Sequence, residues 1–328
     1  MIVVTGGAGF IGSNLLAALE ARGERDLVVC DRLGSGGKWR NIAKREIAHI
    51  LAPERLFDFL DAHAEEVRLV FHLGAISDTR ETDADRLVDC NLAPTLALWQ
   101  WCAGHDVRFV YASSAATYGD GSQGFDDDPS PEALGRLRPL NGYAWSKLAA
   151  DRRFVRLTER GGAEPPQWAG LKFFNVYGPN EYHKEGMRSV AVQAYEQIAA
   201  GEPVRLFRSD RADVLDGGQL RDFIWVDDCV DVMLWLLDDP DVSGLFNVGT
   251  GAARSFADLA GAVFAALDRP ARIEYVDMPQ TLRGRYQYFT QARTERLRAA
   301  GYDRPFTGLE DGVGRYVRDF LSAPDPYR

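Results

Sequence analysis

The chain has 328 residues, of which 46% are hydrophobic and 26% are charged, a composition typical of a globular protein with a large core. Its formal net charge of -10 argues against a nucleic-acid partner, because such proteins neutralise phosphates with a basic face. No apolar run approaches the roughly 18 residues of a membrane span, so we expect no membrane partner and a cytoplasmic location. The four cysteines and five histidines are scattered, and we expect neither disulfides nor a metal site.

The first half of the chain alternates between apolar runs typical of buried strands and amphipathic stretches typical of helices. We expect strands at 2–5, 27–31, 69–73, 107–112 and 171–174, and helices over 14–21, 86–103 and 143–158. This alternation predicts an α/β fold, a Rossmann-type doubly wound parallel sheet that forms a dinucleotide-binding domain over 1–174.

After residue 174, glycines and prolines divide the chain into shorter elements, and the polar loop 208–220 is mostly acidic. We expect strands at 221–226 and 245–248 that return to the main sheet, so that segments near 221–250 complete the first domain. Helices over 256–267 and 308–321 and a strand at 273–276 predict a smaller, partly interleaved α/β domain over 175–328, which would bind the substrate.

A glycine-rich turn follows the first strand. Gly6, Gly9 and Gly12 form a G-x-x-G-x-x-G pattern between that strand and the first helix, and Phe10 and Ile11, which lie within the pattern, are assigned to the same cofactor site. Absent side chains let the backbone approach a dinucleotide pyrophosphate, and the helix N-terminus faces its negative charge. The turn therefore predicts a dinucleotide site.

The end of the second strand leaves the choice of dinucleotide open. Asp31 is placed to accept hydrogen bonds from the adenine ribose, which favours NAD. Arg32 and Lys38 lie close by and could hold the 2′-phosphate of NADP.

The third strand ends in a segment that would pass beneath the cofactor. Asn91, on the next helix, is predicted to tie the end of that strand, or else it is an exposed polar residue of the helix. The residues of the segment that we assign to the cofactor site are Leu73, Gly74, Ala75, Ile76 and Ser77.

Two further segments supply a candidate catalytic set. Ser114 lies at the carboxyl end of a predicted strand, the edge at which open α/β sheets bind ligands. Tyr143 and Lys147 are four residues apart and so share one helical face. Ser114 could hydrogen-bond a substrate oxygen, Tyr143 could exchange its proton, and Lys147 could lower the tyrosine pKa and hold the nicotinamide ribose. Together with the glycine turn, this set predicts hydride transfer by a nicotinamide cofactor.

This combination resembles the extended short-chain dehydrogenase/reductase superfamily over essentially the whole chain. Residues 221–228 and 246–251 also resemble later motifs of that superfamily. The resemblance implies a Rossmann domain with a smaller C-terminal domain that grips a nucleotide sugar, and it implies that Arg221 binds a substrate phosphate.

Residues 111–119, 173–191 and 283–290 narrow the resemblance to the ADP-heptose 6-epimerase family. That family inverts C6″ of ADP-heptose for lipopolysaccharide core synthesis, by transient oxidation to a ketone and re-reduction with a tightly bound cofactor. The resemblance implies that Tyr143 serves one epimer and Lys184 the other. It also implies NADP as the cofactor, with NAD possible, and a homo-oligomer, often a pentamer.

The same motif match assigns further contacts. Val176 and Lys184 are placed beside the cofactor. The residues assigned to the substrate are Asn175, Gly186, Gln193, Phe207, Arg208, Ser209, Arg221 and Tyr286. The chain departs from the family pattern at several positions, since Gly186 replaces a serine, Gln193 a histidine, Cys90 an asparagine and Pro53 a lysine. The loop 208–220 is also longer.

Two alternatives stay open. One is another nucleotide-sugar 4-epimerase or a dehydratase of the same superfamily, although a dehydratase would carry an Asp-Glu pair near residues 117–119. The other is a non-catalytic regulator that senses a dinucleotide on this fold. Such regulators typically lose the Tyr/Lys pair, which this chain retains as Tyr143 and Lys147.

Overall fold

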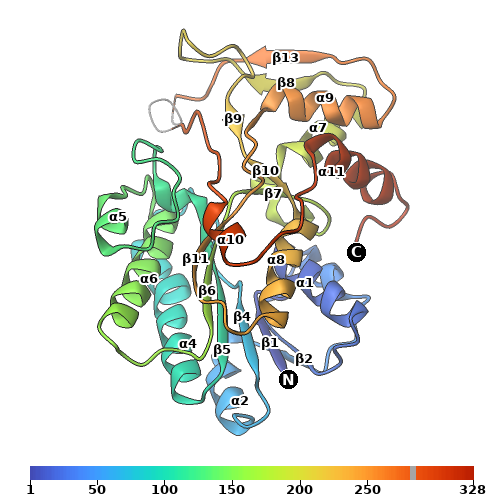
Figure 1. The fold of residues 1–328 in the computed structure, drawn as a ribbon. Helices are drawn as coiled ribbons and strands as arrows, with labels where there is room; N and C mark the ends of the chain where they lie inside the picture. The colour runs from blue at the N-terminus through green and yellow to red at the C-terminus, as the bar shows by residue number, and fades with distance from the viewer. Residues whose placement is uncertain (281–285) are drawn as a thin grey trace.

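The computed structural model of the chain describes residues 1–280 and 286–328. Three residues of the segment 283–290, which carries part of the family resemblance, lie outside the described residues: Arg283, Gly284 and Arg285. Within them, a seven-stranded sheet with its helices forms the lower part of Figure 1, and three two-stranded sheets lie above it. No helix in the described ranges is long and apolar enough to cross a membrane.

The large sheet is parallel throughout and confirms the predicted doubly wound fold. Its strand order is β11-β6-β5-β4-β1-β2-β3. The strands are β1 (Ile2–Thr5), β2 (Leu27–Cys30), β3 (His49–Leu51), β4 (Leu69–His72), β5 (Arg108–Ser114), β6 (Trp168–Phe173) and β11 (Gly244–Val248). The strand order reverses between β1 and β4, and ligands of such sheets bind in the crevice at that point.

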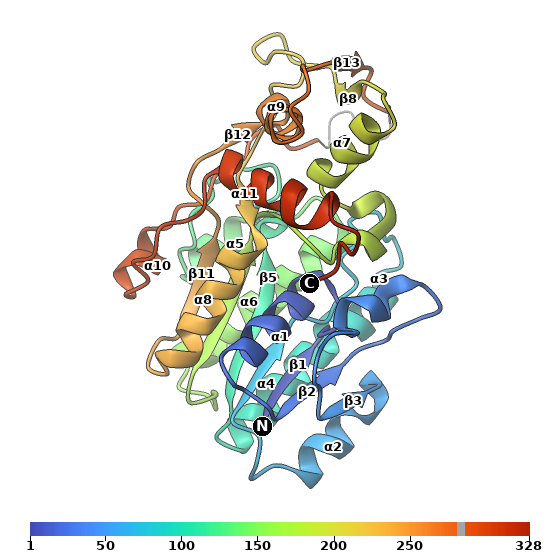
Figure 2. The same ribbon diagram turned by 90° about the vertical axis from the view of Figure 1, so that its right-hand side faces the viewer.

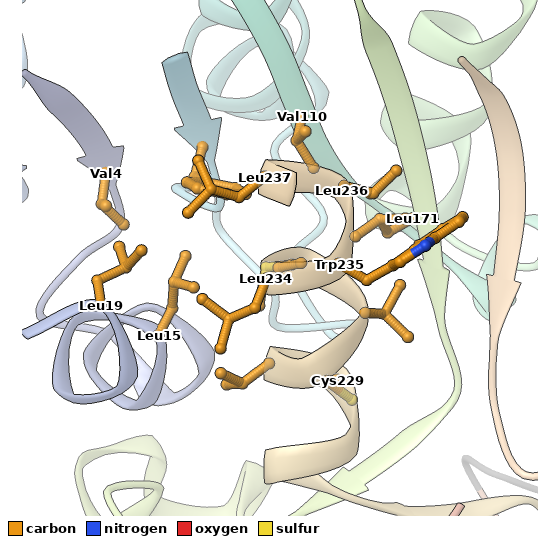
Figure 3. Close-up of a cluster of buried hydrophobic side chains, with 14 of the residues drawn as sticks. Val4, Leu15, Leu19, Val110, Leu171, Cys229, Leu234, Trp235, Leu236 and Leu237 are labelled. Carbon is orange, nitrogen blue, oxygen red and sulfur yellow. The ribbon is translucent and has the colours of Figure 1, made fainter. Parts of the chain in front are cut away.

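Helices cover both faces of the sheet, as Figure 1 shows with α1 (Phe10–Ala21) and α8 (Val226–Asp238) on one side and α4 (Ala93–Gly104) and α6 (Gly142–Glu159) on the other. Successive strand residues point to opposite faces, so Val4 packs into one core and Val3 into the other. Figure 3 shows the first core, where Leu15 of α1 and Leu234 of α8 lie beside the sheet. The sheet is therefore fixed from both sides, which makes its carboxyl edge a rigid base for a site.

A third core lies between the smaller sheets and the later helices, in the upper part of Figure 2. The paired strands are β7 (Asn175–Tyr177) with β10 (Phe223–Trp225), β9 (Leu220–Arg221) with β12 (Arg254–Ser255), and β8 (Val204–Phe207) with β13 (Ile273–Val276). The helices around them are α7 (Val190–Ala199), α9 (Phe256–Ala266) and α11 (Leu309–Arg315), continued by η6 (Tyr316–Leu321). The short helix α10 (Glu295–Ala299) lies apart from them beside β11, and its Leu297 packs into the first core.

Short helical segments connect these layers. They are η1 (Gly37–Ile42), η2 (Pro53–Arg55), α2 (Leu56–Ala62), α3 (Ala84–Leu87), η3 (Val88–Leu92), η4 (Ala115–Tyr118), α5 (Pro131–Arg136) and η5 (Tyr182–Met187). Of these segments, η1 and η5 supply residues that line the site described below, namely Lys38, His183, Lys184 and Met187.

The two segments expected to return to the main sheet behave differently. β11 joins it beside β6, as expected for 245–248. Residues 221–226 instead form parts of the small sheets and the start of α8. The reason is a set of tertiary contacts, since the buried Asp222 carboxylate accepts backbone hydrogen bonds from Thr250, Gly251 and Ala292 and so holds this segment above the sheet. The boundary at residue 174 stays a prediction.

Candidate active site

A cavity of about 460 Å³ opens at the carboxyl ends of β1, β4, β5 and β6, within the size range of small-molecule sites. It brings together residues predicted from widely separated segments. The predicted site residues that line it are Gly6, Gly9, Phe10, Ile11, Gly12, Asp31, Lys38, Leu73, Gly74, Ala75, Ser77, Ser114, Tyr143, Lys147, Asn175, Val176 and Lys184.

The glycine turn forms one wall, and its backbone leaves no room for side chains. Gly6 has a φ of 67°, and a Cβ on it would lie 2.6 Å from the Gly74 nitrogen. A Cβ on Gly12 would lie 2.3 Å from the Gly6 carbonyl oxygen. Gly9 is the N-cap of α1 and places the N-terminus of that helix at the cavity. A cradle of bare backbone at a helix N-terminus fits the pyrophosphate of a dinucleotide.

Asp31, Lys38 and Arg32, at the predicted ribose end of the site, make different contacts. The Asp31 carboxylate accepts hydrogen bonds from the Ala8 amide at 3.0 Å and from Lys38 Nζ at 2.5 Å. Arg32 pairs instead with Glu54, and both side chains are largely exposed. Among the described residues, Lys38 is a cation of the cavity wall and Arg32 is not. The cofactor contact of Arg32 stays a prediction.

Asn91 holds the segment after β4 from outside the cavity. Its side-chain oxygen accepts a hydrogen bond from the Ile76 amide at 2.8 Å, and its nitrogen donates to the Ile76 carbonyl at 3.0 Å. Neither residue is among the described residues that line the cavity, whereas the neighbouring Ser77 is. Asn91 therefore ties the end of the strand, the first of the two predicted roles.

Ser114, Tyr143 and Lys147 meet on the opposite wall. Asn141 caps α6 by accepting the Ala144 amide at 2.9 Å, which places Tyr143 and Lys147 in the first turns on one face. Burial raises the pKa of Tyr143, and its hydrogen bond with Ser114 acts in the opposite direction. Burial lowers the pKa of the Lys147 ammonium to about 8, against the opposing charge of Asp151. These three residues thus bring together a hydroxyl group, a phenol and an ammonium group whose pKa is about 8.

Lys184 reaches the same cavity from η5, with its ammonium 5.5 Å from the centre of the Phe10 ring. Burial lowers the pKa of this ammonium, while the charge of Glu181 raises it. The backbone here is irregular, since Glu185 has a φ of 48°, a value that residues other than glycine rarely adopt.

Three asparagines dock the segment before Lys184 onto the cofactor wall. Asn180 Nδ2 donates to Ser13 Oγ at 3.0 Å, Asn14 Nδ2 donates to the Pro179 carbonyl at 2.9 Å, and Asn41 Nδ2 donates to the Asn180 carbonyl at 3.0 Å. These contacts bring Lys184 beside the first helix, from which it is far removed in sequence.

The predicted substrate end is an aromatic cluster around Arg221. The guanidinium lies 5.1 Å from the Tyr286 ring centre and 5.5 Å from that of Phe256, and Phe207 meets Tyr286 edge-on. Burial lowers the pKa of Arg221, although it remains far above neutrality as for any arginine. Phe256 also lines the cavity, so the cluster adjoins it.

Four other predicted substrate residues make contacts within the protein. Gln193 Nε2 donates to the Arg188 carbonyl at 2.8 Å, and Arg208 pairs with Asp277 at 3.0 Å. Ser209 forms a local turn with Arg211, and Gly186 lies nearest to Arg80. None of the four is among the described residues that line the cavity. Their substrate contacts stay predictions.

The chain is similar to known proteins over its whole length. The family model for the NAD dependent epimerase/dehydratase family matches residues 2–249. A protein of Nitratidesulfovibrio vulgaris (strain DP4), named ADP-L-glycero-D-manno-heptose-6-epimerase, is 50% identical over 330 residues that cover 100% of each chain.

The chain belongs to the NAD dependent epimerase/dehydratase family. This confirms the resemblance to nucleotide-sugar epimerases.

Solved structures of this epimerase/dehydratase family agree. ADP-L-glycero-D-manno-heptose-6-epimerase of Helicobacter pylori matches with a TM-score of 0.79 and 28% identity, over 98% of this chain and 96% of that one. UDP-glucose 4-epimerase of Thermus thermophilus, in complex with NAD, matches with a TM-score of 0.76 and 26% identity, over 98% and 99%.

The main residue of this family member that sequence reasoning missed is Glu181. It is 1% exposed, lines the cavity, and accepts hydrogen bonds from Ser189 Oγ at 2.7 Å and Tyr316 Oη at 3.0 Å. Burial raises the pKa of its carboxyl group, against these hydrogen bonds and the charge of Lys184. The one sequence signal was its position three residues before Lys184, a spacing that brings side chains together in a helical turn.

His183 was missed as well. It lines the cavity with its Nδ1 3.1 Å from Asn41 Nδ2. Burial, together with the charges of Lys38 and Lys184, lowers its pKa to about 4, so the ring is neutral at pH 7.

Proposed function

We propose that the chain inverts C6″ of ADP-D-glycero-D-manno-heptose to give the L-glycero epimer, for lipopolysaccharide core heptose synthesis. The observation that carries the proposal is the shared cavity, which joins Tyr143 and Lys184 from separate segments. It is supported by full-length identity of 50% to a relative named for this activity. Inversion through a ketone needs hydride return to the opposite face of the carbon. The sugar oxygen can then exchange its proton with a different group in each half-reaction, and two candidate groups face this cavity.

The cofactor is a nicotinamide dinucleotide, in keeping with the family, and when bound it supplies reversible hydride transfer. The glycine cradle, Asp31 and Lys38 are the residues that would hold it. For its ribose end we propose NADP, since the Lys38 ammonium is a cation of the wall beside Asp31. Lys38→Ala should lower affinity for NADP more than for NAD, because its ammonium lies on the cavity wall beside Asp31. Titration calorimetry with both dinucleotides checks this, and equal losses for both in Lys38→Ala would refute the NADP assignment.

In the proposed reaction Tyr143 exchanges a proton with the sugar oxygen for one epimer, and Lys184 does so for the other. Ser114 hydrogen-bonds the same oxygen, and the Lys147 ammonium favours the ionised phenol of Tyr143. Burial lowers the pKa of the Lys184 ammonium, which makes it easier for this group to give up its proton.

At the other end of the substrate, Arg221 is proposed to bind the diphosphate, with Tyr286 and Phe207 beside it. Asn175 and Val176 line the cavity between the two ends. A cytoplasmic homo-oligomer, a pentamer by resemblance, completes the proposal. Light scattering after gel filtration measures its mass.

The direct test is to incubate the purified protein with ADP-D-glycero-D-manno-heptose and to follow C6″ by NMR. We expect conversion to a mixture of both epimers without net consumption of cofactor. UDP- and dTDP-hexoses serve as the comparison. Turnover of these sugars in place of ADP-heptose would favour a 4-epimerase or a dehydratase of the same family.

A further inference from the structure

Asp151 lies one helical turn beyond Lys147 and two beyond Tyr143, on the same face of α6. Its side chain has no exposed surface, although a buried carboxylate is costly unless it is paired and hydrogen-bonded. The roles assigned to Tyr143, Lys147 and Ser114 do not explain why a charge is buried at this depth.

Three donors from two neighbouring strands satisfy this carboxylate. Tyr111 Oη and Ser113 Oγ of β5 donate to it at 2.9 and 2.7 Å, and Lys172 Nζ of β6 donates at 2.5 Å. The next residue after Ser113 is Ser114, so the same hydrogen bonds fix the strand end that carries the catalytic hydroxyl. Asp151 therefore connects α6 with β5 directly behind the three catalytic groups.

We propose that Asp151 is a positioning residue of this site, which locks the end of β5 that carries Ser114 against the face of α6 that carries Tyr143 and Lys147, and which supplies the negative charge behind them. The proposal rests on the proposed function, because it assigns Asp151 to the reaction of those three groups.

The surroundings of Asp151 give the direction of its electrostatic effect. Its titratable and charged neighbours come from α6, β5, β6 and η4, and His72 of β4 additionally faces Lys147. These neighbours are Tyr143, Lys147, Tyr111, Lys172 and Tyr118. The charge of Asp151 raises the pKa of Lys147 and of Tyr143. Loss of that charge should therefore lower both.

Asp151→Asn alone would leave Lys172 as an unpaired buried cation, which is strongly destabilising. The variant to test is therefore Asp151→Asn with Lys172→Gln, which removes both charges and leaves an amide to donate to Thr117 Oγ1, the other partner of Lys172. Ser113→Ala removes one tie and keeps the charge. Asp228→Asn is the matched control, because Asp228 is also buried and accepts two hydrogen bonds from Thr307, but on α8 away from the cavity.

The first readout is the pH dependence of kcat/KM for ADP-heptose. We expect the double variant to shift both limbs of the profile to lower pH and to lower kcat by about tenfold or more. Ser113→Ala should lower kcat without moving the profile, and Asp228→Asn should lose only stability. An unmoved profile in the double variant would overturn the proposal.

The second readout needs no turnover. Lys147 is acetylated with acetic anhydride at a series of pH values, and the extent of reaction is measured by peptide mass spectrometry. In the wild-type protein the acetylation rate should have its midpoint at about pH 8. The midpoint should be lower in the double variant and unchanged in Asp228→Asn. If the unmodified chain does not convert ADP-heptose, the proposed function fails, but a shifted midpoint still supports the electrostatic role of Asp151. Equal midpoints in all three proteins would refute that role.

Discussion

Lys147 and Lys184 face the same cavity from two very different backbones. Lys147 lies within α6, a regular helix of 18 residues, whereas Lys184 lies in the six-residue segment η5 with Glu185 at a φ of 48°. Burial lowers the pKa of both ammonium groups, and in each case a nearby carboxylate, Asp151 or Glu181, opposes it. Similar electrostatic surroundings are thus built once on a regular helix and once on an irregular turn.

The two walls differ in what holds them. Hydrogen bonds within α6 and the cap at Asn141 fix Lys147 locally. Lys184 depends on tertiary contacts, because Asn180, Asn14 and Asn41 dock its segment onto the first helix. We therefore expect the α6 wall to tolerate few substitutions, and the backbone of the η5 wall to adjust to more of them.

The largest effect is expected at the phenol of the α6 wall. Tyr143→Phe removes a proton donor and acceptor and should lower kcat by about 10²–10⁴-fold with cofactor binding intact. The control is Tyr302→Phe, since Tyr302 loses the same hydroxyl group but packs against Trp235 outside the cavity. Steady-state kinetics by NMR compares them. A Tyr143→Phe enzyme with near-normal kcat would remove Tyr143 from the chemistry.

Glycines of the dinucleotide turn and of η5 offer a second contrast. Gly12→Ala places a Cβ 2.3 Å from the Gly6 carbonyl oxygen and should weaken dinucleotide binding by about tenfold or more. Gly186→Ala meets only Arg80 Nη1, at 3.7 Å, and should leave folding and dinucleotide binding unchanged. Titration calorimetry and thermal unfolding measure both. Equal losses would mean that the η5 wall is as tightly packed as the turn.

A smaller effect concerns stability. The pKa of Lys147 is about 8 in the folded protein, against an ordinary value of 10.5 for lysine, so the unfolded chain binds this proton more tightly. Burial of the charge therefore lowers the free energy of unfolding below pH 8, and this penalty is relieved as the pH rises from 8 to 10.5. At pH 7, Lys147→Met should raise the free energy of unfolding by up to about 3 kcal/mol while activity is lost. Urea unfolding at pH 7 and pH 10 tests this, and a gain that is no larger at pH 7 would contradict it.

The sequence was most informative where local rules decide the structure. Apolar runs and amphipathic stretches located six of the seven strands of the main sheet, all but β3. The glycine spacing and the four-residue spacing predicted the dinucleotide turn and the pair Tyr143 and Lys147. Tertiary contacts decided the rest. Arg32 turns outward because Glu54 pairs with it, and residues 221–226 stay out of the sheet because Asp222 binds backbone amides of distant loops. Glu181 escaped notice because its partners Ser189 and Tyr316 come from α7 and η6.

The central claim is that Tyr143 and Lys184 act on opposite epimers. The most direct measurement is single-turnover oxidation of each ADP-heptose epimer by Tyr143→Phe and by Lys184→Met, followed by the absorbance of the reduced nicotinamide. We predict a crossed pattern, in which each variant is slowed far more with one epimer than with the other, and the two variants differ in which epimer is affected. Equal slowing of both epimers by both variants would contradict the division of labour between the two walls.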